Sequence, residues 1–406
     1  MAVYQGFETG QPTMHRITLD LPVPEIHAGE LARRIFFISE TITDFTLVRS
    51  GDQISAVDVA VEDEADLDGL TRKLRFVVAN DVVAQRPFDP KVIWSRETGV
   101  ASRDVFGELT ERGIATEPGQ GLVAFGEPVL SLMDYLDARV RALVIAEFGA
   151  KEYRYPTIMP VSVLNRCGYL KSFPQLMMFV SRLHSDVDVY RRFLSDLDDG
   201  QDLTKRLCAD AADVEYCLPP TMCFHTYAQL AGRALPTASA VFTSRGKSFR
   251  FESRYQRSLE RLWDFTIREI VFVGPRDFVV RSRARLMELT FALAAELGLS
   301  GYCGVANDPF FVSTDTAERV WSQQLLELKY ELRVPLEADR DVAVCSFNFH
   351  DRFFGQAFGI ESAAGDGAAY TACAGYGLER FAYAFLCQHG LDPSGWPAEV
   401  RKAVIP

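Results

Sequence analysis

The sequence predicts an α+β protein built on a large antiparallel sheet flanked by helices, with a small α/β unit ahead of it. In the C-terminal half of the 406-residue chain, short β-like runs follow one another at residues 239–243, 248–252, 265–273, 325–332 and 343–349. Two long stretches of helical spacing interrupt them, at residues 277–297 and 377–389. Strands in runs, with helices set apart, favour an antiparallel sheet in an α+β domain.

The small unit is assigned to residues 1–115 and the main domain to residues 116–406. Apolar periodicity in the small unit predicts strands and helices at residues 17–21, 27–39, 45–49, 54–61 and 67–77. Residues 94–121, rich in Gly, Thr and Glu, are expected to connect the two domains. The small unit holds 12 Lys and Arg against 19 Asp and Glu, a net charge of −7. Because a domain that binds nucleic acid is normally basic, this unit is expected to contact protein or to have a structural role.

The main domain is expected to begin with a long amphipathic helix at residues 129–148, where apolar residues recur every three to four positions. A strand is expected next, at residues 152–160, and it ends at Pro160. The polar stretch at residues 191–213 is expected to form a surface helix with loops.

The amino-acid composition and net charge argue against some kinds of binding partner. Hydrophobic residues make up 48% and charged residues 24%, as in ordinary globular domains, and the net charge is −12. Such an acidic chain disfavours a nucleic-acid partner. No apolar run reaches the roughly 18 residues of a membrane span, and the first 14 residues lack the apolar core of a secretory signal. We therefore expect a cytoplasmic protein with no membrane partner.

The first residues that suggest chemistry are Arg250 and Glu252, each preceded by a phenylalanine. Side chains two apart on a strand project from the same face of the sheet. An Arg guanidinium is well shaped to hold a phosphate through two hydrogen bonds. An ion pair at the edge of a sheet is the alternative for this pair when it is taken alone.

Two later segments strengthen the phosphate interpretation. A returning strand places Phe265 and Glu269 on one face. Much further along, the run Gly-Tyr-Gly-Leu-Glu-Arg ends at Arg380, in the first turn of an apolar helix. Glycine permits close approach of the backbone, and an arginine there can face an anion together with the positive helix end.

In this order, the segments resemble the three signature motifs of the class II aminoacyl-tRNA synthetases over about residues 120–406. The helix and strand that end at Pro160 resemble motif 1, which implies a homodimer. Residues 249–269 resemble motif 2, and residues 375–380 resemble motif 3. The implied sheet is of the class II synthetase type.

The resemblance implies a role for each motif residue. Arg250 would hold the α-phosphate of ATP, Glu252 would lie by the adenine edge, and Phe265 would stack on the adenine. Arg380 would hold the γ-phosphate, and Arg261 would also belong to the ATP site. The implied reaction is formation of an aminoacyl-adenylate from Mg²⁺–ATP, in which the protein positions the reactants and neutralises charge. Arg250 and Arg380 are accordingly the catalytic candidates.

Further stretches are similar to the amino acid:[carrier protein] ligases, truncated relatives of the atypical zinc-containing seryl-tRNA synthetases: residues 218–225, 261–269, 306–311 and 346–350. That family holds zinc through Cys, Glu and Cys, which implies Cys223, Glu269 and Cys373 here. Spacing alone does not indicate this site, because eight scattered cysteines without a C-x-x-C pair are typical of free buried thiols. Three protein ligands would leave the fourth zinc position to the neutral α-amino group of a substrate.

The same resemblance implies a substrate pocket, with candidates Asn307, Lys329, Glu331, Ser346 and Asn348. For each of these a structural role is the alternative, such as a turn at Asn307 or a solvated strand face at Lys329 and Glu331.

One position departs from the family pattern. The seryl enzymes place a magnesium-binding glutamate six residues before the Asn that matches Asn348, and this chain has Val342 there. Asp341 is the nearest carboxylate, so the ligands of Mg²⁺ stay unassigned. His225, beside Cys223, is expected to be a packed histidine rather than a fourth zinc ligand.

The acceptor of the activated amino acid is expected to be a carrier protein. The chain ends 26 residues after Arg380 without an anticodon-type domain, and the small unit is acidic without a long coiled coil. A phosphopantetheine thiol would then attack the adenylate. An acidic carrier protein is expected to dock on a basic patch, for which the candidates are Arg191, Arg192, Lys205 and Arg206; a solvated helix face is the alternative.

Several functions therefore compete. The leading one is ATP-dependent ligation of a small amino acid, such as glycine or alanine, to a carrier protein, with the additional small unit suggesting secondary metabolism. The second is aminoacylation of tRNA, which the acidic charge makes unlikely. The third is a catalytically silent, synthetase-like regulatory subunit, against which the retained Arg250 and Arg380 argue. Transfer of the adenylate to a small amine is a further option.

Overall fold

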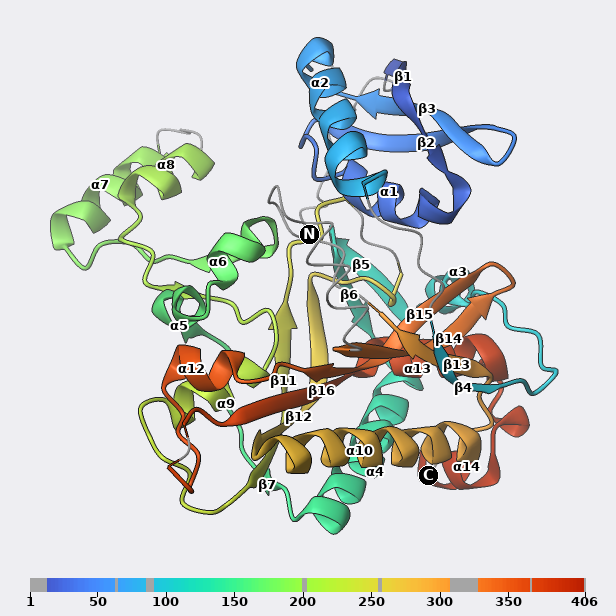
Figure 1. Ribbon diagram of the computed structural model, residues 1–406. Coiled ribbons are helices and arrows are strands. Elements are labelled where there is room, and N and C mark those ends of the chain that lie inside the picture. The colour runs from blue at the N-terminus through green and yellow to red at the C-terminus, as the bar shows by residue number, and fades with distance from the viewer. Residues whose placement is uncertain are drawn as a thin grey trace.

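A computed structural model describes residues 13–62, 65–84, 91–198, 203–254, 258–306, 328–365 and 367–404. The substrate candidate Asn307, and with it most of the family-like stretch at residues 306–311, lies outside the described residues. Figure 1 shows a small N-terminal part set above a larger body that contains the main sheet.

The main domain is organised around an eight-stranded sheet. In spatial order its strands are β4 (Val92–Arg96), β13 (Gly301–Val305), β14 (Lys329–Glu337), β15 (Arg340–Phe349), β16 (Tyr370–Gly377), β12 (Asp264–Gly274), β11 (Ala240–Phe249) and β7 (Lys151–Glu152). Neighbouring strands are antiparallel except β7, which runs parallel to β11. The predicted α+β fold with an antiparallel sheet is confirmed.

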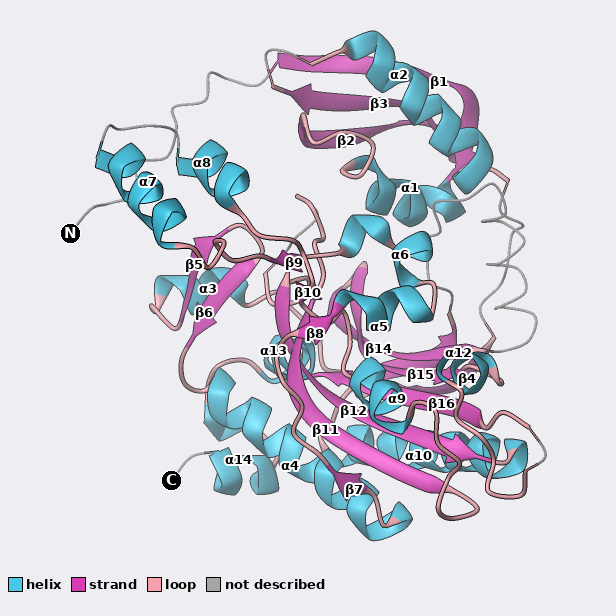
Figure 2. Cartoon of the chain, turned by 90° about the vertical axis from the view of Figure 1, so that its left-hand side faces the viewer, coloured by secondary structure: helices cyan, strands magenta, loops and turns pink. Residues whose placement is uncertain are grey.

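Three long helices pack on one face of this sheet and bury its main apolar core: α4 (Val129–Phe148), α10 (Arg276–Glu296) and α13 (Leu378–His389). The short helices on the other face are α5 (Val161–Arg166), α6 (Tyr169–Ser172), α9 (Cys223–Leu230) and α12 (Phe353–Phe358). Three of these, α5, α9 and α12, share a second apolar cluster with β11, β12 and β16. Figure 2 shows α9 and α10 on opposite sides of the strands. This second face carries the cavity described below.

The remaining elements of the main domain lie at its margins. The short strands β8 (Met159–Pro160), β9 (Phe179–Val180) and β10 (Tyr216–Cys217) form a small sheet, and β5 (Ala115–Gly119) pairs with β6 (Leu122–Phe125) as a hairpin. The marginal helices are α3 (Phe106–Glu111), α7 (Val187–Asp198), α8 (Leu203–Asp210) and α14 (Ala398–Val404). The helix pair α7–α8 projects from the body in both views.

The described part of residues 13–84, which we call the N-terminal module, forms a three-stranded antiparallel sheet with two α-helices. Its elements are β1 (Thr13–Pro24), α1 (Ala28–Ile35), β2 (Ile42–Ser50), β3 (Gln53–Val61) and α2 (Leu67–Val77), with β3 in the centre of the sheet. The module buries an apolar cluster of its own.

The expected boundary at residues 115 and 116 differs from the packing. β4 pairs with β13 at the edge of the large sheet, and Trp94 stacks on Phe291 of α10 at 4.9 Å. Val105 and Leu109 are fully buried in the main core. The stretch predicted as a connection therefore packs with the main domain, because its strand pairs with residues about 200 positions away, which local composition does not reveal.

Three predicted strands are also corrected. The strand expected at residues 152–160 is reduced to β7 and β8, which belong to different sheets, and prolines at 156 and 160 remove donors that a longer strand would need. The two strands expected at residues 239–252 are one, β11, and Arg250 and Glu252 lie beyond its end.

None of the helices in the described part of the chain combines the length and the apolar character required to cross a membrane.

Candidate active site

A cavity of about 850 Å³ opens over the second face of the sheet, within the usual range for small-molecule sites. Of the predicted site residues, those that line it are Cys223, Arg250, Phe265, Glu269, Lys329, Glu331, Ser346, Asn348, Cys373 and Arg380. Glu252 and Arg261 do not line it but lie beside it, joined to each other by an ion pair of 2.7 Å. Residues scattered over more than 150 positions thus meet in one place.

Strand register explains how the sheet gathers these side chains. Directly paired residues of an antiparallel sheet share a face. Glu331 pairs with Ser346, Ser346 with Gly375, and Gly375 with Glu269, which makes one row across four strands. The adjacent row joins Lys329, Asn348 and Cys373. Two rows of polar side chains therefore face the cavity.

Gly375 leaves the middle of the first row open. A Cβ atom at this position would lie 2.7 Å from Ile267 Cδ1 and 3.7 Å from a Glu269 carboxylate oxygen. Any other residue would force Ile267 aside and fill space next to the carboxylate.

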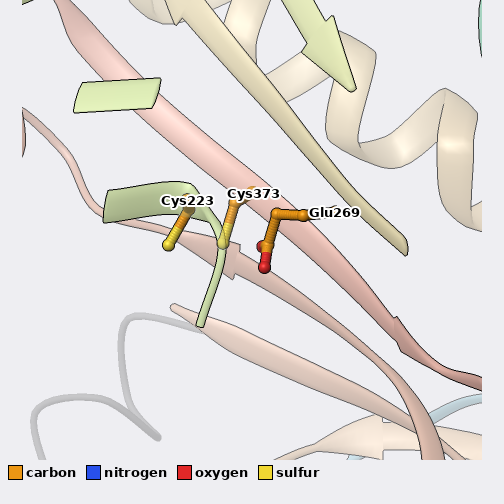
Figure 3. Close-up of side chains that lie close together, drawn as sticks. All are labelled: Cys223, Glu269 and Cys373. Atoms are coloured by element: carbon orange, nitrogen blue, oxygen red, sulfur yellow. The ribbon is translucent and has the colours of Figure 1, made fainter. Parts of the chain in front are cut away.

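Cys223, Glu269 and Cys373 form a compact cluster on the floor of the cavity. Their ligand atoms lie within 4.8 Å of one another, and all three side chains are buried. Cys223 begins α9, Glu269 is in the middle of β12, and Cys373 is in β16. Figure 3 shows the three side chains next to one another, with the two sulfur atoms and the carboxylate extending to the same side.

The chemistry of this donor set fits a zinc ion. Two thiols and a carboxylate, buried together, are ligand types that Zn²⁺ binds. Burial raises the pKa of Glu269 to about 7, and a hydrogen bond with Cys223 together with burial raises the pKa of the Cys373 thiol well above its ordinary value. These shifts mean that the protein alone does not favour the anionic forms of these groups; a cation would restore them.

Neighbouring polar groups orient the cluster. The Thr221 hydroxyl donates to a Glu269 oxygen at 2.6 Å. The Asn348 amide donates to Cys373 Sγ at 3.6 Å, and His350 Nε2 lies 3.7 Å from the same sulfur. Such outer contacts fix the direction of metal ligands.

Arg250 and Phe265 stand together in the same cavity. The guanidinium carbon of Arg250 lies 5.4 Å from the centre of the Phe265 ring, which is a cation–π contact. Arg250 Nε donates to the Pro220 carbonyl at 3.0 Å. Pro220 precedes Thr221 and Cys223, so the arginine and the Cys–Glu–Cys cluster are held by one short segment.

Arg380 and Arg261 bring further positive charge close to Arg250. Burial, aided by repulsion from Arg261, lowers the pKa of Arg380 to about 10. Burial opposes ionisation of Glu252, but the charges of Arg261 and Arg250 lower the pKa of this carboxyl below its ordinary value. Three guanidinium groups thus lie around Glu252, and guanidinium groups suit an anionic ligand.

Lys329 and Glu331 form an ion pair of 3.1 Å on β14, and Glu331 also pairs with Arg333 at 2.7 Å. Although burial opposes it, the charges of Lys329 and Arg333 lower the pKa of Glu331 to about 2. Both β14 candidates line the cavity and are mostly buried, so the alternative of a solvated strand face is wrong.

The cavity also contains residues that the sequence did not single out. Thr221 and His350 lie within family-like stretches but have no motif of their own. Glu379 is buried, and both its oxygens accept from the Thr266 amide at 2.8 Å. Its place beside Arg380 in motif 3 is the signal that could have found it.

Two further residues near the site, His225 and Asp341, contact other side chains of the protein. His225 is stacked on Tyr155 at 5.2 Å, and burial lowers its pKa to about 4, which agrees with a packed neutral histidine. Asp341 accepts hydrogen bonds of 2.8 Å from Tyr302 and Arg333. Asp341 is therefore occupied by protein partners.

The residues expected to form a basic patch for carrier-protein docking lie among acidic residues. On the helix pair α7–α8, Arg192 pairs with Asp210 at 2.8 Å, and Arg206 pairs with Asp196 and Asp210. Arg191 lies 3.5 Å from Asp188. Acidic residues interleaved on the same helices neutralise these arginines, which a list of basic positions in the sequence overlooks.

The fold, with the motif 2 and motif 3 segments around one cavity, defines a class II synthetase-type domain. Among solved structures, the chain is similar to M. kandleri SerRS in complex with A. aeolicus tRNASec, with a TM-score of 0.69 and 22% identity over 96% of this chain and 77% of that one. It is also similar to a cytoplasmic serine–tRNA ligase from Naegleria fowleri in complex with AMP, with a TM-score of 0.59, 10% identity and coverage of 83% and 71%.

Sequence comparison identifies the family within this class. The chain is 36% identical over 275 residues to amino acid–[acyl-carrier-protein] ligase 1 of Bradyrhizobium diazoefficiens, covering 67% of this chain and 82% of that protein. Its identity to ligase 2 of the same organism is 38% over 250 residues, or 61% and 72% of the two chains. The chain belongs to the amino acid–[acyl-carrier-protein] ligase family.

The type-2 serine–tRNA ligase of Methanocaldococcus jannaschii is a more distant relative, 24% identical over 95% of this chain and 74% of that protein. No family model matches the chain.

Proposed function

We propose that this protein activates an amino acid with ATP as the aminoacyl-adenylate and transfers it to the phosphopantetheine thiol of a carrier protein. One observation carries the proposal: the Cys223–Glu269–Cys373 cluster opens into the same cavity as Arg250, Phe265 and Arg380. Groups that could bind an amine through a metal ion therefore lie next to groups that could bind phosphates. A reaction between an amino acid and ATP requires both substrates to be held close together. The names of the Bradyrhizobium ligases support the amino acid and the acyl-carrier protein as substrates.

At the amino-acid end, Cys223, Glu269 and Cys373 would hold the zinc ion. When bound, zinc supplies a position for the neutral α-amino group, which selects free amino acids over other carboxylates. Thr221 keeps Glu269 oriented, and Asn348 with Ser346 lines the floor beside Cys373. Lys329 and Glu331 bound the same side of the cavity. We propose that the substrate is a small amino acid.

At the nucleotide end, Phe265 would stack on adenine with Glu252 at its edge, and Arg261 would hold Glu252 in place. Arg250 and Arg380 would bind the α- and γ-phosphates of the Mg²⁺–ATP complex. A carboxylate oxygen of the amino acid attacks the α-phosphorus, the bond to the β-phosphate oxygen breaks, and pyrophosphate leaves. Fixed guanidinium groups lower the barrier because they neutralise charge as it develops.

In the second step, the phosphopantetheine sulfur attacks the carbonyl carbon of the adenylate after the thiol loses its proton. A thioester forms, the anhydride bond to phosphate breaks, and AMP leaves. The relation to serine–tRNA ligases makes tRNA the competing acceptor. The presence of Arg250 and Arg380 in the cavity disfavours a catalytically silent subunit. We further propose a cytoplasmic enzyme of secondary metabolism.

The experiment that tests this function is amino-acid-dependent exchange of pyrophosphate into ATP over all twenty amino acids, with zinc measured on the same sample. We expect exchange with one or a few small amino acids and about one zinc per chain. Exchange-competent protein is then offered carrier protein and tRNA separately. Charging of tRNA alone would favour the competing acceptor, and absence of both exchange and ATP binding would contradict the proposal.

A further inference from the structure

The N-terminal module, to which the proposed chemistry assigns no role, contacts the main domain at the connection between β11 and β12. We call the described residues of this connection, 250–254 and 258–263, the β11–β12 loop. The Ser253 hydroxyl donates to the Phe36 carbonyl at 3.1 Å, and Arg254 pairs with Glu62 at 2.7 Å. Figure 1 shows the module above the end of the sheet from which this loop projects.

Both contacts end on consecutive residues that directly follow Glu252. Phe36 lies just after α1, and Glu62 just after β3, so two separate elements of the module converge on the loop. The Ser253–Phe36 contact is buried, with Ser253 7% and Phe36 8% exposed, whereas the Arg254–Glu62 pair is partly solvated. Because solvated ion pairs contribute little, the hydroxyl contact is the stronger of the two.

Ser253 also has an uncommon backbone conformation. Its φ is +52°, in the left-handed region that non-glycine residues seldom adopt. Such a conformation persists where surrounding contacts over-determine it. Two contacts do so here: the hydroxyl is held by Phe36, and the carbonyl accepts from the Trp263 indole at 3.1 Å. The module therefore supplies one of the groups that hold the bend.

A short chain of contacts leads from this bend to the nucleotide end of the cavity. Trp263, which donates to the Ser253 carbonyl, accepts at its own carbonyl from the Arg250 amide at 3.0 Å. Glu252 lies between Arg250 and Ser253 and is 7% exposed. A change in the bend at Ser253 would shift both Arg250 and Glu252, because each is within three residues of it and tied to the same tryptophan or its neighbours.

We propose that Ser253 is a positioning residue through which the N-terminal module sets the conformation of the β11–β12 loop and thereby the affinity for ATP. The inference rests on the proposed function in that ATP is taken as the ligand of Arg250 and Glu252. Thermodynamic linkage makes the effect reciprocal. Bound ATP strengthens the contact between the module and the loop by the same factor by which this contact increases the affinity for ATP.

The test uses full-length protein and pyrophosphate exchange. Ser253→Ala is expected to raise the KM for ATP about threefold to tenfold, the order of one lost hydrogen bond. The KM for the amino acid should change less than twofold. Ser253→Gly also lacks the hydroxyl but adopts the left-handed backbone without strain, so it should raise the KM for ATP similarly. Arg16→Ala is the matched control, because it removes an ion pair with Asp58 inside the same module.

A second readout follows the module itself. Hydrogen exchange of the amides of residues 35–38 should slow when a non-hydrolysable ATP analogue and Mg²⁺ are added to the unaltered chain, and not in Ser253→Ala. An unchanged KM for ATP in both Ser253 variants would overturn the inference. A normal KM for ATP in Ser253→Gly alone would also overturn the inference. It would show that the left-handed backbone maintains the ATP affinity without the hydroxyl contact to the module. If the protein shows no amino-acid-dependent pyrophosphate exchange, but the ATP analogue still protects the amides of residues 35–38, the proposed reaction is overturned. The inference about Ser253 then still holds.

Discussion

At the scale of single residues, the cavity gathers ionisable groups that are buried almost completely. Cys223 and Cys373 are 4% and 5% exposed, and Glu269 is 2% exposed. Burying three acidic groups within 4.8 Å of one another is unfavourable unless protons or a cation neutralise them. This arrangement supports the proposed zinc site more strongly than the sequence spacing does.

The proposed zinc site makes a direct prediction for Cys223→Ala. The variant should lose both bound zinc and amino-acid-dependent exchange, because two remaining protein ligands bind the ion far more weakly. Zinc content and pyrophosphate exchange measure the two effects. Cys217→Ala is the control, since Cys217 is a buried thiol of the same apolar cluster that does not belong to the Cys–Glu–Cys group. Full activity in the Cys223 variant would contradict the site.

A second prediction concerns Arg250. Replacement by Ala should reduce the rate of adenylate formation about 100-fold or more, which is the order expected for losing one major charge stabiliser. Arg245→Ala provides a control on β11, because Arg245 pairs with Asp134 and Asp137 away from the cavity. An effect confined to transfer onto the carrier protein would show that Arg250 has a different role.

The third prediction uses the low pKa of Glu331. Its folded pKa of about 2 lies below the ordinary 4.5, so its ionised form stabilises the fold above pH 4.5. This contribution is lost as the pH falls from 4.5 toward 2, and is on the order of 3 kcal/mol at most. Glu331→Gln should therefore be less stable than the unaltered protein at pH 7, and the difference should shrink toward pH 2. Thermal unfolding measured across this range would reveal a constant difference if the interpretation were wrong.

At the scale of elements, the β5–β6 hairpin supports the β11–β12 loop. The Gly121 carbonyl accepts from the Trp263 amide at 2.8 Å, and Gly121 has a φ of +69°. A Cβ atom on Gly121 would lie 2.4 Å from the Trp263 ring. The glycine is thus required both by its backbone and by the approach of the tryptophan.

Two glycine variants separate these requirements. Gly113, with a φ of +67°, has no atom within 4 Å of an added Cβ, so Gly113→Ala should cost only the backbone strain of about 1 kcal/mol. Gly121→Ala adds the clash with Trp263 and should lower the melting temperature further. It should also raise the KM for ATP, which Gly113→Ala should leave unchanged. Equal effects of the two variants on both measurements would show that the hairpin does not support the loop.

At the scale of the whole molecule, we propose a homodimer through the region that resembles motif 1. Large apolar side chains are exposed there: Leu130 on α4 and, beyond β7, Tyr153 and Ile158, each 38–45% exposed. Sedimentation should report twice the 45.4 kDa mass of one chain. Ile158→Asp should shift the mass toward that of the monomer, because a charge would be buried in the contact. Arg16→Ala, in the N-terminal module, should leave the mass unchanged.

Patterns that are local in the sequence predicted their elements closely. The helices expected at residues 67–77 and 129–148 are α2 and α4 with the same ends, because helical periodicity is carried within the segment itself. The strand expected at residues 265–273 is β12 with one more residue at each end. By contrast, β16 was not predicted, since its run of small residues and tyrosines has no alternation that signals a strand.

The sequence by itself determined the fold class, the family and the residue types available for chemistry. The tertiary structure alone decided which of these residues meet. Glu269 and Cys373 come together because β12 pairs with β16 in one particular register, and Cys223 joins them because α9 packs on that face of the sheet. The arginines of α7–α8 are neutralised, and Ser253 is held by Phe36, for the same reason. Contacts between distant positions depend on pairing and packing in three dimensions, which no local pattern of residues specifies.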